Sequence, residues 1–409
     1  MMDFANKIFR GDRIIWMIFA ALCLISVVEV YSASSMLTFK TNFWQPIIKH
    51  TMFLLGGIVV VLLVHSMNPK YFWIFVVMIP FVWLLLGAAQ SLGQTVNGAN
   101  RYILGFQPSE LAKLSLIACV AFFLSRQKSK ISESASFWWI WFFTLLTCVL
   151  IVRDNLSTAA ILYCVIVIMM FIGQVPFKRM GLLILVTFAF AALLFSFIWF
   201  YPDIAEKAKL KRGVIWVDRI KHYKEQPEIT KDGKIPDSVF QSTMAKIALA
   251  RGGIFGKMPG NSHLSDFLPQ AYSDFIYAII IEETGIIGGI VVLALYVFLF
   301  IRAGTIAGRC TKLFPKLLVM GCALMIAIQA LVNMAVSVGL MPVTGQPLPL
   351  VSRGGSSILI TCVFIGIILS VSRFENPRGI QQEGVIDEEF EEEKRLSYSE
   401  ENLELQPLY

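Results

Sequence analysis

Ten long apolar runs divide this 409-residue chain, and each is about as long as one membrane-crossing helix. They lie near residues 14–35, 47–66, 71–90, 109–125, 137–152, 156–173, 180–200, 274–301, 314–340 and 355–373. Hydrophobic residues make up 56% of the sequence and charged residues only 15%, which is more apolar surface than one soluble core can hide. We therefore predict an all-α polytopic membrane protein with about ten transmembrane helices.

Basic residues gather in alternate connections between these runs. With the N-terminus inside, the short inner connections contain Lys7, Arg10, Arg13, Lys70, Arg126, Lys128, Lys130, Lys178, Arg179, Arg302, Arg309, Lys312, Lys316, Arg373 and Arg378. The short outer connections contain only Lys40, Lys49, Arg101, Arg153 and Arg353. Because short loops rich in lysine and arginine stay inside, we expect both termini in the cytoplasm.

The polar remainder of the chain falls into three parts. Residues 1–13 form a cytoplasmic N-terminus, and residues 201–273 form a large extracellular loop between the seventh and eighth helices of the membrane domain 14–373. Residues 374–409 hold eleven acidic and three basic residues, so we expect a disordered cytoplasmic tail. The rest of the chain is basic, which suits contact with anionic membrane lipids and not a nucleic-acid partner.

Part of the long outer loop has a helical pattern. Phe240, Met244 and Ile247 recur at helical spacing, and Gly252-Gly253 follows as a stop signal. We predict an amphipathic helix that lies on the membrane or on the helix bundle.

Charged residues within or beside apolar runs are functional candidates, because charge is costly in a bilayer. Glu110 and Lys113 are three residues apart and can pair on one helix face, either as substrate-binding groups or as a self-neutralising pair. Ser109 is expected to cap that helix. Arg101 is a candidate phosphate binder, or alternatively a snorkelling anchor.

Two further polar stretches interrupt the apolar pattern. The stretch around Asp154 predicts either a helix break that lines a cavity, and so binds substrate, or a tight turn at the surface. Glu282 and Glu283 lie two turns inside the eighth run, so at least one needs a partner, for which Lys113 and Arg353 are the candidates.

The segment from Pro342 to Ser357 contains three prolines and three glycines and cannot continue a helix. We predict a re-entrant loop packed over a cavity. Its amides and hydroxyls suit a pyrophosphate group. The substrate-binding candidates here are Ser352, Arg353, Gly354, Gly355 and Ser356.

Three stretches carry a resemblance to a known family: NGANRYILGFQPSELAKL (97–114), FGKMPGNSHLSDFLPQAYSDFIYAIIIEETG (255–285) and GLMPVTGQPLPLVSRGGSS (339–357). Over residues 13–373 the chain resembles the SEDS family (shape, elongation, division and sporulation). The resemblance implies ten spans, a large extracellular loop after the seventh, and a bacterial cytoplasmic (inner) membrane location. It also implies a peptidoglycan glycosyltransferase that polymerises lipid II beside a class B penicillin-binding protein.

The family's essential carboxylate corresponds to Asp274, which the resemblance makes the catalytic residue. The surrounding pattern departs from the family at Gln270, Tyr272 and Ser273, and Arg353 stands where a tyrosine is common. A sugar hydroxyl is a poor nucleophile, so a carboxylate would act as general base. No metal cluster is readable in the sequence, although Asp274 with substrate phosphates could hold a divalent cation, Mg²⁺ or Mn²⁺.

Within the family, the YSASS stretch (31–35) and the long charged tail favour a division role at the septum, with divisome regulatory proteins as partners. The VTGQPLP stretch (343–349) keeps the elongation type as an alternative. A lipid II flippase or transporter is the rival class, in which Glu110, Lys113, Glu282 and Glu283 would line a path across the membrane. A non-catalytic division scaffold is a third reading. An enzyme needs its essential residues to converge at the outer face, whereas a flippase needs them across the bilayer.

Overall fold

The computed structural model describes residues 10–32, 44–96, 99–103, 105–126, 130–201, 213–214, 217, 237–262, 264 and 271–374. Most of the N-terminal segment, most of residues 202–236 and the tail after residue 374 lie outside the described residues, as do the predictions made for them.

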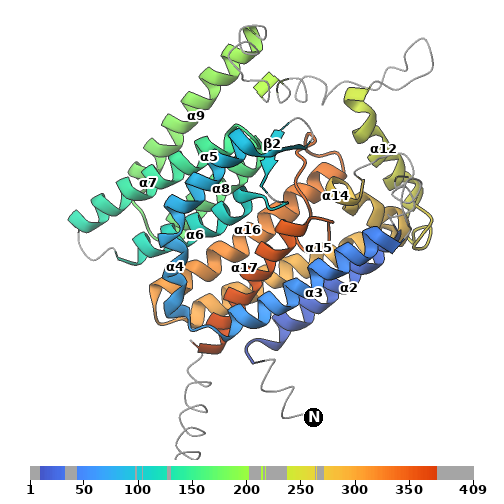
Figure 1. Cartoon of the computed structure of the whole chain (residues 1–409), viewed down its shortest axis with the longest axis horizontal. Coiled ribbons are helices and arrows are strands. Elements are labelled where there is room, and N and C mark those ends of the chain that lie inside the picture. The colour runs from blue at the N-terminus through green and yellow to red at the C-terminus, as the bar shows by residue number, and fades with distance from the viewer. Residues whose placement is uncertain are drawn as a thin grey trace, which may run out of the picture.

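All ten apolar runs are helical (Figure 1). The helices are α2 (Arg13–Ser32), α3 (Trp44–Ser66), η2 (Pro69–Trp73) with α4 (Ile74–Val77) and α5 (Ile79–Leu92), α6 (Pro108–Ser125), α7 (Lys130–Val152), α8 (Leu156–Ile172), α9 (Phe177–Phe200), α15 (Ile276–Arg309), α16 (Leu313–Ser337) and α17 (Gly355–Phe374). In the described part of the chain, eight helices are long and apolar enough to cross a membrane. The pair Pro69–Val77 and Ile79–Leu92, bent by 46°, would make a ninth, and α8 is a shorter apolar helix at the sixth run. The predicted fold class is confirmed, and the exact number of spans stays a prediction.

One small hairpin departs from the all-α prediction. Strands β1 (Gln94–Val96) and β2 (Ala99–Tyr102) pair antiparallel between α5 and α6, with Val96 opposite Ala99. The two residues between them in the sequence are Asn97-Gly98, and this dipeptide is the strongest short-range signal for a tight hairpin.

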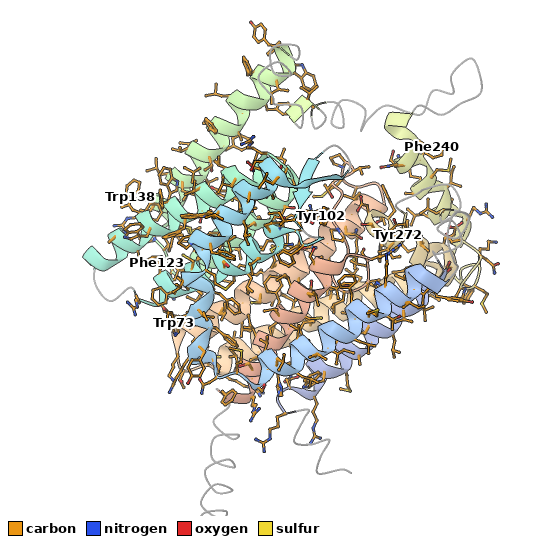
Figure 2. The ribbon with its side chains drawn as sticks, viewed as in Figure 1. Trp73, Tyr102, Phe123, Trp138, Phe240 and Tyr272 are labelled. Atoms are coloured by element: carbon orange, nitrogen blue, oxygen red, sulfur yellow. The ribbon has the colours of Figure 1, made fainter. Side chains whose placement is uncertain are left out.

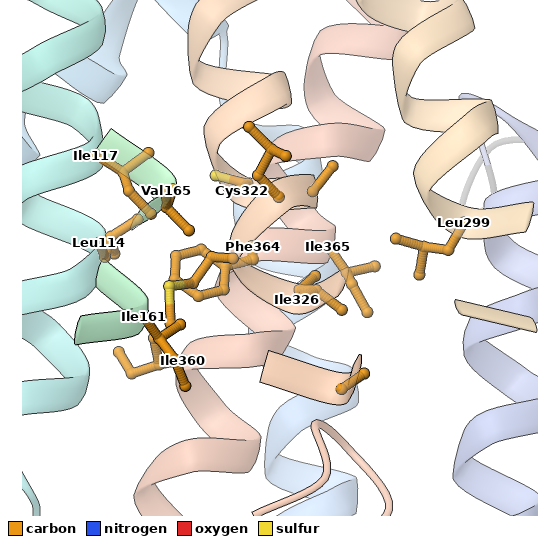
Figure 3. Packing of buried hydrophobic residues seen from close by; sticks show 14 of the residues in the cluster. Leu114, Ile117, Ile161, Val165, Leu299, Cys322, Ile326, Ile360, Phe364 and Ile365 are labelled. Carbon is orange, nitrogen blue, oxygen red and sulfur yellow. The ribbon is translucent and has the colours of Figure 1, made fainter. Parts of the chain in front are cut away.

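The centre of the bundle is formed by α6, α16 and α17. In the most apolar 18-residue stretch of each of these helices, 78% is buried inside the protein. The corresponding share is 12% in α9, which stands at the margin of the bundle (Figure 1). Side chains from α6, α8, α16 and α17 interdigitate in this core, among them Ile117, Val165, Cys322 and Phe364 (Figure 3). The outer helices leave large apolar side chains exposed, as expected where the surroundings are lipid.

Helices α3 and α17 run parallel and approach closely through glycines. A Cβ atom on Gly57 would lie 2.6 Å from the Cys362 sulfur, and one on Gly366 would lie 2.8 Å from Val64 Cβ. At the start of α17, a Cβ on Gly355 would meet the ring of Phe53 at 2.7 Å. Small residues are what permit this close approach. The contacts fix the register and place the first residues of α17 beside the first half of α3.

The amphipathic helix predicted in the long loop is α12 (Asp237–Gly252), and it packs on the bundle against α15 (Figure 1). The segment after it pairs with a break in α15 at Gly285, whose φ is 75°. The Lys257 amide donates to the Glu282 carbonyl at 3.0 Å, and the Ile286 amide donates to the Gly253 carbonyl at 3.0 Å. A Cβ on Gly285 would lie 2.0 Å from the Ile254 carbonyl oxygen, so only glycine fits.

Candidate functional site

The segment between α16 and α17 folds back into the bundle, as predicted for a re-entrant loop. Leu348 and Val351 are buried, and the Pro347 carbonyl accepts a hydrogen bond from Gln329 Nε2 at 3.0 Å. Gln329 lies eight residues before the end of α16 at Ser337. At 1.5 Å per residue, the loop therefore descends roughly 12 Å below the end of that helix.

Ser352 fixes the tip of this loop and joins it to Ser273, the residue before Asp274. Its hydroxyl accepts from the Leu348 amide at 2.7 Å and donates to the Ser273 carbonyl at 2.6 Å. The Ser352 amide closes the same turn by donating to the Leu348 carbonyl at 2.9 Å. The predicted substrate-binding residue Ser352 is thus occupied in holding the loop against the residue that precedes Asp274.

Asp274 ends the short helix α14 (Ala271–Asp274), just before α15 begins. Its side chain is half-buried, and its Oδ1 accepts from the Ser273 hydroxyl at 2.9 Å. Asn333 Nδ2 donates both to the Asp274 carbonyl at 3.0 Å and to the Gln346 carbonyl at 2.7 Å. A Cβ on Gly345 would lie 3.5 Å from Asp274 Oδ2. The carboxyl group therefore sits against the re-entrant loop at the N-terminal end of α15, where the helix dipole favours negative charge.

Arg353 lies beside the same segment. Its guanidinium carbon lies 5.2 Å from the centre of the Tyr272 ring, and its amide donates to the Tyr272 carbonyl at 3.2 Å. Arg353 and Tyr272 are both positions at which the sequence departs from the family pattern, and the structure shows that the two departures contact each other. A cation over an aromatic face is attractive, so each substitution suits the other.

The remaining residues of the predicted pyrophosphate segment open α17. Gly355 and Ser356 lie in its first turn, and the Gly354 carbonyl accepts from the Ile358 amide at 2.9 Å. The N-terminus of a helix presents amides toward anions. This geometry suits the predicted phosphate contact, which stays a prediction.

Glu110 and Lys113 form the predicted ion pair. Their charged atoms are 2.7 Å apart, and both side chains are buried. Lys113 Nζ also donates to Gln329 Oε1 at 3.1 Å, and Gln329 in turn holds the Pro347 carbonyl. One side chain therefore connects this pair to the re-entrant loop.

The prediction that Ser109 caps α6 is wrong. The helix begins at Pro108 after Gln107, and Ser109 instead accepts a hydrogen bond from Gln107 Nε2 at 2.9 Å. Proline suits the first position of a helix because its missing amide hydrogen is not needed there.

The stretch around Asp154 is a tight turn between α7 and α8, which agrees with the second of the two predictions made for it. Asp154 Oδ2 accepts from Gln90 Nε2 of α5 at 3.4 Å. Its neighbour Asn155 caps α8 through the Thr158 amide and accepts from Gln346 Nε2 at 3.2 Å. Asn155 is thus the residue of this turn that reaches the re-entrant loop. The side chain of Arg101, on β2, lies outside the described residues.

Sequence reasoning missed the amides that join these parts. Gln329, Asn333 and Gln346 each connect the re-entrant loop to another element. Their signal was weak but present, because each is a polar side chain within or beside an apolar segment.

Tyr272 and Tyr102 lie toward one end of the bundle, and Trp73 lies toward the other (Figure 2).

The expectation that Lys113 or Arg353 neutralises Glu282 or Glu283 is wrong. Glu282 Oε2 accepts from the Ser262 hydroxyl at 2.7 Å and from the Leu264 amide at 3.2 Å, and Arg251 lies 3.6 Å from Oε1. Glu283 accepts from the Ser32 hydroxyl of α2. Both carboxyl groups therefore bind the long loop and α2 to α15. No group of three or more metal-binding side chains occurs within the described part of the chain.

The fold and this site define a polytopic helical membrane protein with a polar centre built around a re-entrant loop. Residues 12–377 match the family of cell cycle proteins that includes FtsW, RodA and SpoVE, and the chain belongs to that family, as its SEDS-type motifs predicted.

Named relatives and solved structures agree with this assignment. The chain is 35% identical over 311 residues to the probable peptidoglycan glycosyltransferase FtsW of Marinobacter nauticus, covering 71% of this chain and 72% of the relative. It is 31% identical over 371 residues to the protein of the same name from Saccharophagus degradans, covering 85% and 89%. Its fold resembles crystalline RodA of Thermus thermophilus, with a TM-score of 0.62 and 24% identity over 89% of this chain and 97% of that chain. It also resembles a chain from a study of polymerization and crosslinking by a peptidoglycan synthase complex, with a TM-score of 0.67 and 24% identity over 90% and 99%.

Proposed function

We propose that this chain is a peptidoglycan glycosyltransferase that polymerises lipid II into glycan strands. One observation carries the proposal beyond family membership: Asp274 lies at the start of α15 with its carboxyl group against the re-entrant loop at Gly345. That loop also bears Arg353 and leads into the α17 N-terminus. In this proposal the base Asp274 and the candidate anion-binding groups share one end of the bundle, where a lipid-anchored substrate would present its sugar and its pyrophosphate together.

In this mechanism Asp274 accepts the proton of the acceptor sugar's 4-hydroxyl as that oxygen attacks the anomeric carbon of the donor. The bond to the pyrophosphate oxygen breaks, and undecaprenyl pyrophosphate leaves with inversion at the sugar. Negative charge develops on the leaving group and needs donors or cations. Arg353 and the amides of Gly354 and Gly355 are the groups proposed for it, together with Arg101.

A divalent ion would suit this site as a companion of the substrate. Mg²⁺ is commonly held by one or two carboxylates with substrate phosphates, and Asp274 offers one half-exposed carboxyl group. Bound there, Mg²⁺ or Mn²⁺ would offset charge on the leaving pyrophosphate. The test is whether a chelator abolishes polymer formation and either ion restores it.

A lipid II flippase is the second candidate, and the distribution of the polar residues favours the enzyme. Glu282 and Glu283 are engaged with the long loop and α2, while the Glu110–Lys113 pair connects through Gln329 to the re-entrant loop. These four residues are therefore engaged in contacts that hold the loops and helices together, which favours the enzyme over a polar path across the membrane. Purified full-length chain, with lipid II as the only substrate, is expected to produce glycan polymer. Transport of labelled lipid II across vesicles without any polymer would favour the flippase instead.

The partners proposed are a class B penicillin-binding protein, which would crosslink the new strands, and divisome regulatory proteins at the septum. The relatives' name and the solved synthase complex support this partner class. A fluorescent fusion of the chain is expected to gather at the division site and to co-purify with that transpeptidase. Uniform distribution along the cell wall would favour the elongation role.

We further propose that both termini are cytoplasmic and that 201–273 is extracellular. Reporter fusions at Lys128 and Lys234 are then expected on opposite sides of the membrane. Reporters on the same side would contradict this orientation.

A further inference from the structure

His50 is a buried histidine in α3 that the proposed mechanism does not use. Only 2% of its surface is exposed. Its Nε2 lies 2.7 Å from the hydroxyl of Ser26 in α2, and that hydroxyl lies 3.0 Å from the carbonyl oxygen of Val351. The three groups form a chain that runs from α3 through α2 to the re-entrant loop.

The chemistry of the serine fixes the direction of this chain. A hydroxyl has one hydrogen to donate, and a carbonyl oxygen can only accept. If Ser26 donates to Val351, then it must accept from His50, so Nε2 carries the hydrogen. His50 Nδ1 is then a lone-pair acceptor, and it has no hydrogen-bond partner among the described residues. The contact that connects His50 to the rest of the molecule therefore runs through Nε2.

The carbonyl held by this chain belongs to the residue just before Ser352 and Arg353. Ser352 binds the Ser273 carbonyl, and the Arg353 amide binds the Tyr272 carbonyl. Those two carbonyls immediately precede Asp274 in the sequence. A displacement of Val351 would thus be passed to the Asp274 carboxyl group through these two hydrogen bonds to the backbone before it.

The packing of α3 against α17 explains why His50 occupies this place. Phe53 meets Gly355, and His50 lies one turn earlier on the same face of α3. The two helices run parallel, so that earlier turn faces the residues before Gly355. These are the residues of the loop tip.

We propose that His50 is a positioning residue for the glycosyl transfer: through Ser26 it holds the re-entrant loop so that Asp274 is correctly placed. The inference rests on the proposed function. His50 does not touch the reacting atoms in this scheme. It orients a hydroxyl that would otherwise rotate, and that hydroxyl satisfies a fully buried carbonyl.

Two isosteric substitutions separate this role from simple filling of space. The amide nitrogen of glutamine can occupy the place of Nε2, whereas that of asparagine reaches only the place of Nδ1. His50→Gln is expected to keep kcat within about threefold of the wild type. His50→Asn and Ser26→Ala are expected to lower kcat by about 10- to 100-fold with KM changed by less than about threefold, because small displacements of a catalytic group have effects of this size. Ser26→Thr keeps the hydroxyl and is expected to restore activity.

The measurement uses the full-length chain with lipid II, and each variant is first checked for an unchanged Tm. Equal kcat for His50→Gln and His50→Asn would overturn the proposal, as would normal kcat in Ser26→Ala.

Amide hydrogen exchange at Ser352 and Arg353 gives a second readout that needs no activity. Faster exchange in His50→Asn than in His50→Gln is expected. If this difference appears in a chain that makes no polymer, the hold of His50 on the re-entrant loop stands and the proposed function fails. If exchange is equal in both, the positioning role fails independently.

Discussion

Two carboxyl groups near the start of helix α15, Asp274 just before the helix and Glu282 within it, have opposite surroundings. Asp274, just before the helix, is half-buried; an amide side chain holds its backbone carbonyl, and a neighbouring serine contacts its carboxyl group. Glu282, two turns further on, is fully buried and accepts hydrogen bonds from Ser262 and the Leu264 amide, with Arg251 nearby.

The difference separates a group that is held for chemistry from one that holds the fold. A carboxyl group whose oxygens are satisfied by the protein has little capacity left for a substrate, and removing it leaves buried donors without partners. A carboxyl group that is fixed by its backbone and still reaches solvent can exchange protons with a bound ligand. On this comparison, substitution of Asp274 should change the rate of turnover, and substitution of Glu282 should change the stability of the fold.

The largest expected effect is that of Asp274→Asn on polymer formation. Loss of a general base typically lowers the rate by about 10²- to 10⁴-fold. Asparagine keeps Oδ1 for the Ser273 hydroxyl, and the Asn333 contact is to the backbone, so Tm should be unchanged. Polymer yield from lipid II measures the effect, with Glu393→Gln in the acidic tail as the matched control. Near-normal polymer from Asp274→Asn would remove this residue from the mechanism.

The buried ion pair beside the re-entrant loop gives the next effect. Lys113→Met leaves Glu110 buried without its cation, which is expected to lower stability by about 3–5 kcal/mol. The double variant Glu110→Met with Lys113→Met should recover most of that loss. Thermal unfolding in detergent measures both variants. If the double variant is stable and polymerises normally, the predicted substrate-binding role of the pair is contradicted.

Glu282→Gln should have a smaller effect, confined to stability. The substitution removes a charge that receives hydrogen bonds from Ser262 and Leu264, and the expected loss is about 1–3 kcal/mol. Unfolding by heat, followed by tryptophan fluorescence, reports this change. An unaltered Tm would show that the carboxylate does not hold the long loop on α15.

Removal of the tail after Glu383 should have the smallest effect of all. The removed segment is strongly acidic and poor in large apolar residues, so we expect it to add nothing to the hydrophobic core. Polymerisation in vitro is expected to stay within about twofold of the full chain. A large loss would make the tail part of the catalytic unit.

Features that depend on neighbours in the sequence were predicted well. The ten apolar runs gave the helices, and the three-residue spacing of Glu110 and Lys113 gave their ion pair. The prolines and glycines before α17 gave the re-entrant loop. Each of these follows from local periodicity or backbone restriction, which a sequence displays directly.

Partners that are distant in the sequence were not predictable in the same way. Glu282 contacts Ser262 because the loop after α12 packs against α15 at Gly285, and no residue spacing in the sequence predicts that contact. The amides of Asn333 and Gln346 were visible as polar residues, but their direction depends on tertiary packing. Where the sequence departs from the family, at Tyr272 and Arg353, only the structure showed that the two residues meet.

The most direct test compares Asp274→Asn and Glu282→Gln in one experiment that counts glycan polymer per folded molecule and records Tm for each. We expect Asp274→Asn to keep the wild-type Tm and to lose polymer formation, and Glu282→Gln to lose stability while its folded fraction polymerises lipid II at the wild-type rate. Polymer from Asp274→Asn at the wild-type rate, or loss of turnover in well-folded Glu282→Gln, would contradict the assignment of catalysis to the start of α15.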